Sequence, residues 1–126
     1  MTAQEPYEIA LAIMDEISTD GTINVTKTAY YAGKAPRLID LLQMELAYIE
    51  GVRVTNRIDA LTDTLEISDD TAMRILPYGL AYQFALADNV QDIYIDAKNE
   101  YYNLKRTIRF DEQDVYDEYN VMDGLK

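Results

Sequence analysis

Residues 35–51 read APRLIDLLQMELAYIEG, and this stretch carries the clearest helical pattern in the chain. Pro36 suits the first turn of a helix, where a residue without an N–H loses no hydrogen bond. Gly51 suits the position after a helix end, where a left-handed backbone is common. The pattern predicts a helix from Ala35 to Glu50. Its mostly apolar face repeats every three to four residues, at Leu38, Leu41, Leu42, Glu45, Leu46 and Ile49.

Two further helices are expected toward the ends of the chain. Thr2 and Glu5 have the spacing of a capping box, which predicts a first helix from about Ala3 to Ser18. Asn89 suits a helix N-cap, and the apolar spacing after it predicts a last helix that ends near Ile108. One face of this last helix carries Val90, Ile93, Tyr94, Ala97, Tyr101, Leu104 and Ile108.

The stretch from Ala72 to Ala87 is strongly apolar and predicts a central, buried helix. Ser68 can cap its start, and Asp69 and Asp70 place acids in the first turn. Pro77 lies inside this stretch, where its missing N–H and its ring disfavour a continuous helix by about 3 kcal/mol. We therefore expect either a helix kinked near Pro77 or two shorter helices.

Two segments between these helices have weaker patterns. Lys27 to Gly33 has room for one or two helical turns, which Gly33 is expected to stop. Val52 to Ser68 follows neither the period of a strand nor that of a helix. We expect a loop there, which could include a short extended segment.

Together the segments predict an all-α protein, a compact bundle of four or five helices with a flexible acidic C-terminal tail. Residues 1–108 form the helical domain in this interpretation, and residues 109–126 form the tail. The expected core contains Leu11, Met14, Leu38, Leu42, Leu46, Ile75, Leu80, Phe84, Ile93, Ala97 and Leu104.

The composition excludes several kinds of function. The chain contains no cysteine and no histidine, which removes disulfides, thiol or imidazole catalysis and nearly every zinc site. With 23 acids against 11 bases, the net charge is −12, and this charge disfavours tight binding to nucleic acid. No apolar stretch approaches the roughly 20 residues that cross a bilayer, and the start does not resemble a signal peptide. We expect a cytoplasmic protein that is neither exported nor bound to a membrane.

Two small clusters are considered as binding sites. Asp69 and Asp70 are adjacent carboxylates that would suit magnesium, but a third ligand at fixed spacing is missing and helix capping explains them better. Lys34 and Arg37 frame a predicted helix start that could hold an anion, although surface solvation or pairing with Asp40 is the simpler explanation. The sequence therefore predicts no catalytic, cofactor-binding or metal-binding residue, and no enzyme.

Tyrosine is unusually frequent, with 11 residues against two Phe and no Trp. Tyrosine serves both at the edge of a core and at protein interfaces, so both uses stay open. The tail mixes apolar residues with acids, which predicts either a partner-docking element or a short helix packed on the domain itself. The candidate partner-binding residues are Tyr102, Phe110, Val115, Tyr116, Tyr119, Val121 and Met122.

Two longer stretches resemble a known family. Residues 10–51 read ALAIMDEISTDGTINVTKTAYYAGKAPRLIDLLQMELAYIEG, with a DGTI turn, a tyrosine-bearing short helix and a leucine-rich helix. Residues 65–108 read LEISDDTAMRILPYGLAYQFALADNVQDIYIDAKNEYYNLKRTI, with Asp-Asp, then ILPYGLA, then a tyrosine-containing helix. Both stretches are similar to the head-tail connector, or head-completion, proteins of tailed phages and prophages.

The resemblance implies a structural virion protein that assembles, as a dodecamer, into a ring beneath the portal and extends the DNA channel. Its implied partners are the portal protein, the next connector or tail-completion protein, and further copies of itself. DNA would pass through without specific binding. The implied location is the head-tail interface of the virion, after assembly in the host cytoplasm. Some relatives insert a β-rich domain between the two halves, where this chain has only Val52 to Thr64.

Two other functions compete with this one. A small acidic helical protein can mimic DNA and occupy a nuclease or a repressor, and this is the leading alternative. A carboxylate-dependent hydrolase is the third, but the chain offers it no third ligand or base at suitable spacing.

Overall fold

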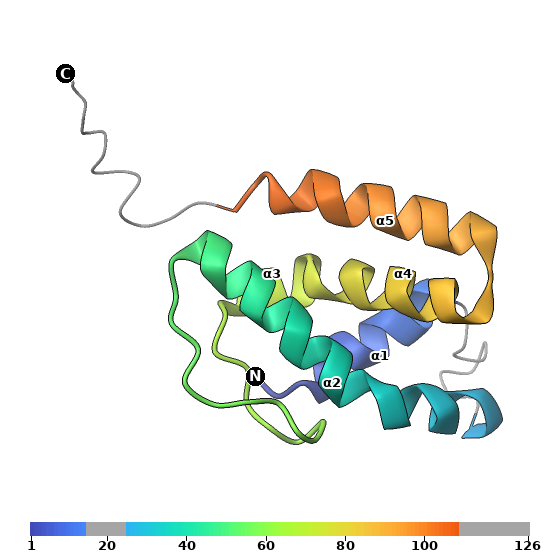
Figure 1. Cartoon of the computed structure of the whole chain (residues 1–126), viewed down its shortest axis with the longest axis horizontal. Helices are drawn as coiled ribbons and strands as arrows, with labels where there is room; N and C mark the ends of the chain where they lie inside the picture. Colours follow the sequence, from blue (N-terminus) through green and yellow to red (C-terminus); the bar gives the residue numbers. More distant parts are fainter. Residues whose placement is uncertain (15–24, 109–126) are drawn as a thin grey trace.

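The computed structural model describes residues 1–14 and 25–108. This part of the chain forms five helices, α1 (Gln4–Ile13), α2 (Val25–Glu50), α3 (Asp69–Arg74), α4 (Leu76–Asp88) and α5 (Gln91–Lys105). Within these residues the structure contains no strand, only an isolated bridge between Thr2 and Thr64. Figure 1 shows the arrangement of the helices. The predicted all-α bundle is confirmed.

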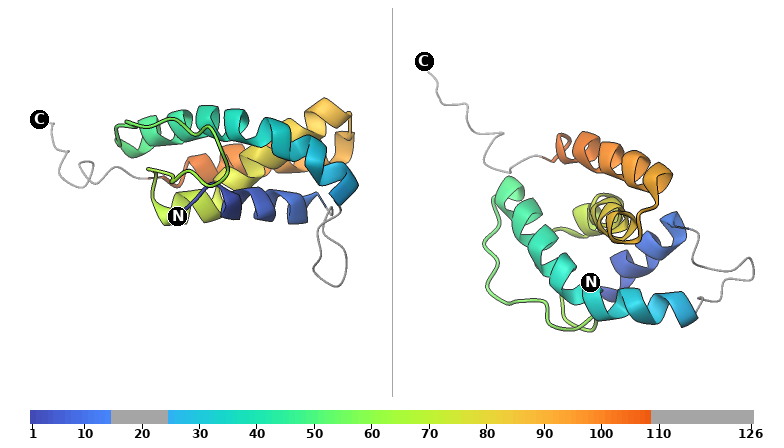
Figure 2. Two further views of the ribbon diagram at one scale, coloured as in Figure 1. Left: turned by 90° about the horizontal axis from the view of Figure 1, so that it is seen from below. Right: turned by 45° about the vertical axis from the view of Figure 1, so that its right-hand side comes forward.

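Helix α4 lies at the centre of the bundle. The right-hand panel of Figure 2 looks along α4 and shows α1, α2 and α5 arranged around it. An apolar sequence on nearly all sides allows a helix to be covered from several directions at once. Its buried residues include Leu76, Leu80, Ala81, Phe84 and Ala85. The predicted central buried helix is confirmed.

The chain breaks between α3 and α4, as expected from Pro77. Helix α3 ends at Arg74, and Ile75 leaves the ideal helical geometry with φ −110°. Pro77 then occupies the first turn of α4, where no N–H is needed. The amides of Tyr78 and Gly79 both donate to the carbonyl oxygen of Ile75, at 3.1 and 3.4 Å. Of the two expected forms, the structure has two separate helices.

Helix α2 departs from the prediction at its start. It begins at Val25 and continues through Gly33 and Pro36, so the expected stop at Gly33 and the expected start at Ala35 are both wrong. Glycine weakens a helix by about 1 kcal/mol but does not end it when the flanking turns pack well. Figure 2 shows that α2 changes direction along its length, which is the usual effect of an internal proline. The predicted end is confirmed, because Gly51 has φ 79° directly after Glu50.

The expected role of Asn89 is also wrong. Asn89 adopts a left-handed backbone, φ 61° and ψ 38°, and ends α4 instead of capping α5. Asparagine tolerates this conformation better than most residues, so it suits both kinds of cap. Helix α5 begins at Gln91 and ends at Lys105, slightly before the predicted Ile108. The first helix ends at Ile13 in the described part, and residues 15–18 of its predicted range lie outside the described residues.

The segment between α2 and α3 is a loop, and polar side chains of α2 hold its backbone. Asp40 Oδ1 accepts a hydrogen bond from the amide of Ile58 at 2.8 Å. Gln43 Oε1 accepts from the amide of Glu66 at 2.6 Å. Buried amides need partners, and a loop without strand pairing must take them from side chains. The loop also contributes to the core, through Ile58, Leu65 and Ile67.

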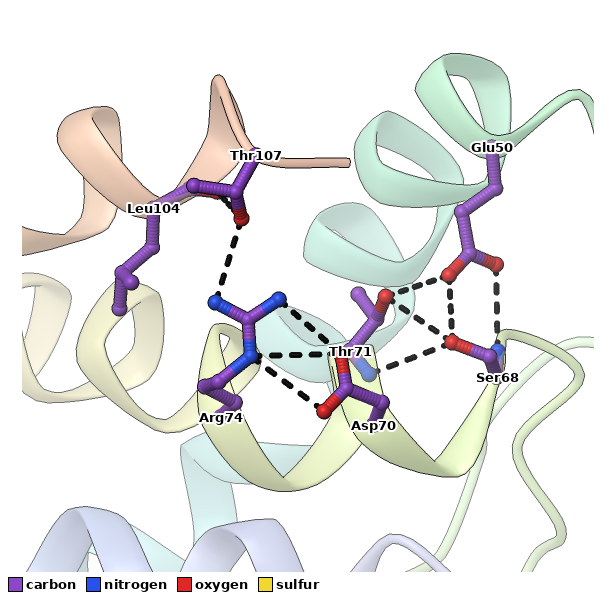
Figure 3. Close-up of polar contacts among 7 residues, drawn as sticks. All are labelled: Glu50, Ser68, Asp70, Thr71, Arg74, Leu104 and Thr107. Atoms are coloured by element: carbon purple, nitrogen blue, oxygen red, sulfur yellow. Dashed lines mark hydrogen bonds and ion pairs between the residues drawn. The ribbon is translucent and has the colours of Figure 1, made fainter. Parts of the chain in front are cut away.

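The start of α3 is fixed by a second polar cluster (Figure 3). Ser68 Oγ accepts a hydrogen bond from the amide of Thr71 at 3.2 Å, which confirms Ser68 as the cap. Glu50, at the end of α2, accepts from the amide of Ser68 at 3.1 Å and from the hydroxyl of Thr71. On the other side, Arg74 pairs with Asp70 at 3.0 Å and donates to Thr107 Oγ1 at 3.2 Å. The cluster joins the ends of α2 and α5 through α3.

The expected core residues lie inside the bundle. Most of them are buried, while Leu38, Ile93 and Leu104 are partly buried against the core. The structure adds side chains that the sequence did not single out as core, and three of them are tyrosines. These additional buried residues include Tyr7, Tyr31, Ile39, Leu76 and Tyr101.

Gly79 permits a close contact between helices. A Cβ atom placed on Gly79 would lie 2.7 Å from Cε1 of Tyr101 and 3.1 Å from Cδ2 of Leu42. The first distance is shorter than real carbon contacts and the second is tighter than most, so a side chain there would have to displace the Tyr101 ring on α5 and press on Leu42 of α2. Glycine at this position is a packing requirement.

We predict that Gly79→Ala lowers the free energy of unfolding by about 1–3 kcal/mol, the usual cost of overpacking a core. Gly33→Ala is the matched control, because Gly33 is also helical but a Cβ atom there would meet no atom within 4 Å. The control should be neutral or stabilising by up to about 1 kcal/mol. Urea denaturation of both variants measures the difference, and equal effects at the two sites would contradict the packing argument.

Candidate interaction surfaces

The structure shows the surroundings of the two clusters that the sequence offered as binding sites. In the described ranges, no group of three or more acidic side chains is placed to hold a metal ion. Asp70 pairs with Arg74, and Asp69 lies 3.9 Å from the N-terminal ammonium. No described helix is long and apolar enough to cross a membrane.

Lys34 and Arg37 do not frame a helix start, because α2 continues through them. The expected anion position at a helix N-terminus is therefore absent from the described structure. Lys34 donates a hydrogen bond to Tyr30 Oη at 2.7 Å and lies over the same ring. Asp40 pairs instead with Arg57, at 3.5 Å. Of the two simpler explanations, pairing with Asp40 is therefore wrong, whereas the exposure of Arg37 agrees with surface solvation.

Of the candidate partner-binding residues, the structure describes only Tyr102. Its ring is partly exposed on α5 and lies 5.6 Å from the ring centroid of Tyr101 and 6.4 Å from that of Tyr82. The ammonium of Lys105 lies 4.4 Å from the centroid of the same ring. Phe110, Val115, Tyr116, Tyr119, Val121 and Met122 lie outside the described residues.

Tyr101 links α5 to α2 beneath this exposed ring. Its hydroxyl donates to Glu45 Oε1 at 2.5 Å, and Lys105 Nζ lies 2.8 Å from Glu45 Oε2. Burial, followed by the neighbouring carboxylate of Glu45, raises the pKa of Tyr101 far above its usual value. Burial and the hydroxyl of Tyr102 raise the pKa of Tyr82 to about 12. These hydroxyls therefore stay protonated at physiological pH.

The carboxylate of Glu45 is stabilised in its charged form. Burial alone would raise its pKa, but the hydrogen bonds from Lys105 and Tyr101 and the charge of Lys105 outweigh burial, so the pKa is lowered. A lowered folded-state pKa adds stability above the unfolded-state pKa, and this contribution is lost as the pH falls through the folded-state pKa. The contact is therefore acid-sensitive.

We predict that Tyr101→Phe destabilises the protein by about 1–3 kcal/mol at pH 7, the typical value of a hydrogen bond to a charged group. Without the hydroxyl, the pKa of Glu45 rises toward its ordinary value, so the difference from the native protein should shrink as the pH falls below about 4. Urea denaturation at several pH values measures this. Tyr48→Phe is the control, since its side chain is largely exposed. A difference that is constant with pH would contradict the assigned contact.

An exposed apolar row lies on α2 and continues just past its end. We call it the α2 outer row, and its members are exposed by 60% at Leu41, 55% at Met44, 84% at Tyr48 and 39% at Val52. Spacing of three and four residues places them on one side of the helix. The inner side of α2 is occupied by Ile39, Leu42 and Leu46, which are buried. Helix α2 thus has two apolar faces.

The α2 outer row was not predicted from the sequence, which assigned Leu41 to the core stripe. The signal is present, because Leu41, Met44 and Tyr48 repeat at helical spacing beside the buried set. Periodicity alone cannot say which of two apolar faces is buried. The loop after α2 flanks the row, and a cavity of about 400 Å³ lies between Leu41, Met44 and Val54.

A second surface lies at the other end of the molecule, between α2 and α4. We call it the basic groove, a depression of about 400 Å³ with Leu38, Phe84 and Leu86 as its apolar lining. Lys34 and Arg37 also line it, and none of the described residues that line it is acidic. The sequence singled out both bases but placed them at a helix start.

Comparison with protein-family models, with curated proteins and with solved structures found no match. Nothing in these comparisons bears on the expected head-tail connector family.

Proposed function

We propose that the protein is a head-tail connector, or adaptor, subunit of a tailed phage or prophage, a structural virion protein without enzymatic activity. It assembles as a ring beneath the portal and extends the DNA channel. The observation that carries this proposal is the α2 outer row, an exposed apolar face on a domain whose core is already filled.

The composition of the row fits a protein interface. Monomeric proteins rarely expose several large apolar side chains together, and such a cluster usually marks a contact with another protein. Methionine and tyrosine are enriched in interfaces relative to the rest of the surface. The row contains one of each, Met44 and Tyr48, next to Leu41. A neighbouring molecule in an assembly would bury it.

The charge of the chain supports the channel function. A net charge of −12 repels the phosphates of passing DNA and prevents it from binding to the channel wall. The partners in this proposal are the portal protein on one side, the next connector or tail-completion protein on the other, and neighbouring copies around the ring. The family resemblance implies twelve copies in the ring.

One observation favours the alternative, an acidic DNA mimic that inhibits a nuclease or repressor. Asp92, Asp96 and Glu100 are all exposed and follow each other at four-residue spacing on α5. They form a row of carboxylates along one side of the helix. Such a protein acts through this acidic row, whereas the connector acts through the α2 outer row. The two functions therefore predict different sensitive residues.

We predict that the paired substitution Leu41→Ser and Tyr48→Ser weakens self-association at least about tenfold, because buried interface anchors each contribute on the order of 1–2 kcal/mol. The melting temperature should change little, since both side chains are exposed in the subunit. Ile95→Ser is the matched control, an exposed apolar side chain on α5. Sedimentation velocity and negative-stain microscopy of rings measure the outcome.

Two results would contradict the connector function. One is the absence of rings both for the protein alone and with the portal protein encoded in the same genome. The other is tight binding to a nuclease or repressor that is abolished by Asp96→Asn and Glu100→Gln but unaffected by the Leu41 and Tyr48 substitutions.

A further inference from the structure

The basic groove is unusual for so acidic a chain. Leu38, which is partly exposed, and Leu86, which is exposed, supply an apolar surface that is backed by the buried Phe84. Lys34 and Arg37 are the charged residues beside it, although acids outnumber bases by 23 to 11 over the chain. Its volume of about 400 Å³ is in the range of pockets that take a ligand or a few side chains. The groove therefore fits a segment that is both apolar and acidic.

The two bases are available for an ionic contact. Lys34 donates to the hydroxyl of Tyr30, which leaves two of the three hydrogens of its ammonium for other acceptors. Arg37 is exposed. Among the residues that the structure describes, neither base forms an ion pair. An incoming carboxylate would not have to displace an existing ion pair.

We propose that the basic groove of one copy receives residues 109–126 of the neighbouring copy in the ring. This inference rests on the ring of the proposed function and identifies one of its subunit contacts. The segment 109–126 carries six acids against Arg109 and Lys126. Within it the run YDEY, residues 116–119, places two carboxylates between two tyrosines. Tyrosine rings fit the apolar lining, and the carboxylates fit Lys34 and Arg37.

The end of α5, where this segment begins, lies away from the basic groove. Arg74, at the end of α3, donates a hydrogen bond to Thr107. Because α4 begins two residues after Arg74, this contact places the end of α5 next to the start of α4. The groove lies at the other end of α4, beside Phe84 and Leu86. Figure 1 shows the C-terminal ends of α4 and α5 at opposite ends of the molecule. From Arg74 to Ala87 the distance along the helices is about 20 Å, at 1.5 Å per residue.

In the proposed ring this separation lets the segment join one end of a subunit to the other end of the next. A contact that joins one end of a subunit to the other end of the next is heterologous, and it generates a ring when the rotation closes. A contact of the segment with its own groove would instead leave each subunit complete and add nothing to assembly. The proposed ring therefore favours the neighbouring copy as the source. At about 3.3 Å per residue the segment is also long enough to reach its own groove, and the double variant below separates the two.

Cross-linking tests the proposal cleanly because the chain contains no cysteine. Two single-cysteine variants of the full chain are mixed, Ala87→Cys beside the groove and Asn120→Cys in the segment, and are treated with a short bismaleimide. The expected product is a heterodimer that contains one of each. Asn99→Cys replaces Ala87→Cys in the control mixture, because Asn99 is exposed on α5, away from the groove. The control should give little product.

The double variant Ala87→Cys and Asn120→Cys separates the possible occupants. Contacts between neighbours produce a ladder of covalent multimers, whereas contact within one chain produces only a monomer of altered mobility. The ladder supports the proposal. The altered monomer overturns it in favour of the chain's own segment. If the cross-linking is no stronger than in the Asn99→Cys control, the proposal is also overturned. The occupant of the groove would then be another protein.

The charge-reversal variant Lys34→Glu and Arg37→Glu provides an independent readout. It should weaken the cross-link between Ala87→Cys and Asn120→Cys by about tenfold or more, since like charges would then face each other. In the protein that keeps Lys34 and Arg37, a higher salt concentration should also weaken this cross-link. Rings that form normally while the charge reversal leaves the cross-link unchanged would overturn the groove contact and leave the connector function standing. Loss of rings in the Leu41 and Tyr48 variant concerns the connector function and does not test the groove contact.

Discussion

The contact between Gly79 and Tyr101 sets the positions of three helices. Because Gly79 has no side chain, the ring of Tyr101 can approach α4 closely enough that even a methyl group would not fit between them. At this depth the Tyr101 hydroxyl reaches Glu45 on α2, at 2.5 Å. Lys105 then meets the same carboxylate one turn later, at 2.8 Å. A single missing side chain thereby fixes α5 against both α4 and α2.

Helix α2 holds the structure together in two ways and still keeps a free face. Its apolar inner side packs into the core through Ile39, Leu42 and Leu46. Its polar side chains Asp40 and Gln43 bind the backbone of the following loop, which therefore needs no strand partner. The core contacts and the hydrogen bonds to the loop both use the side of α2 that faces the rest of the molecule. The α2 outer row lies on the other side, where none of the described residues covers it. The row is a consequence of the fold, and its apolar residues make it available for assembly.

The sequence predicts the structure correctly where a local pattern is compatible with one structure only. It fails where the same pattern is compatible with two. Pro77 inside an apolar stretch predicts a break, and the chain breaks there. Pro36 obeys the same chemistry but lies inside α2, because tertiary packing offsets the cost of its lost hydrogen bond. Leu41 belongs to one of two apolar rows on α2, and only the packed structure says which row is inside. The basic groove has no sequence pattern at all, because Lys34 and Phe84 come from helices that are far apart in the chain.

The distribution of charge bears on the kind of assembly that such a chain can form. Exposed arginines on α2 and the loop after it are Arg37, Arg53 and Arg57, the last paired with Asp40, whereas one side of α5 carries Asp92, Asp96 and Glu100. A symmetric dimer built on either patch would place like charges opposite each other, at an energetic cost that grows as the interface loses water. A head-to-tail contact places the basic side of one copy against an acidic side of the next. For a chain with a net charge of −12, the repulsion between copies is offset most effectively by this second arrangement, which repeats around a ring and leaves no subunit with an unmatched patch.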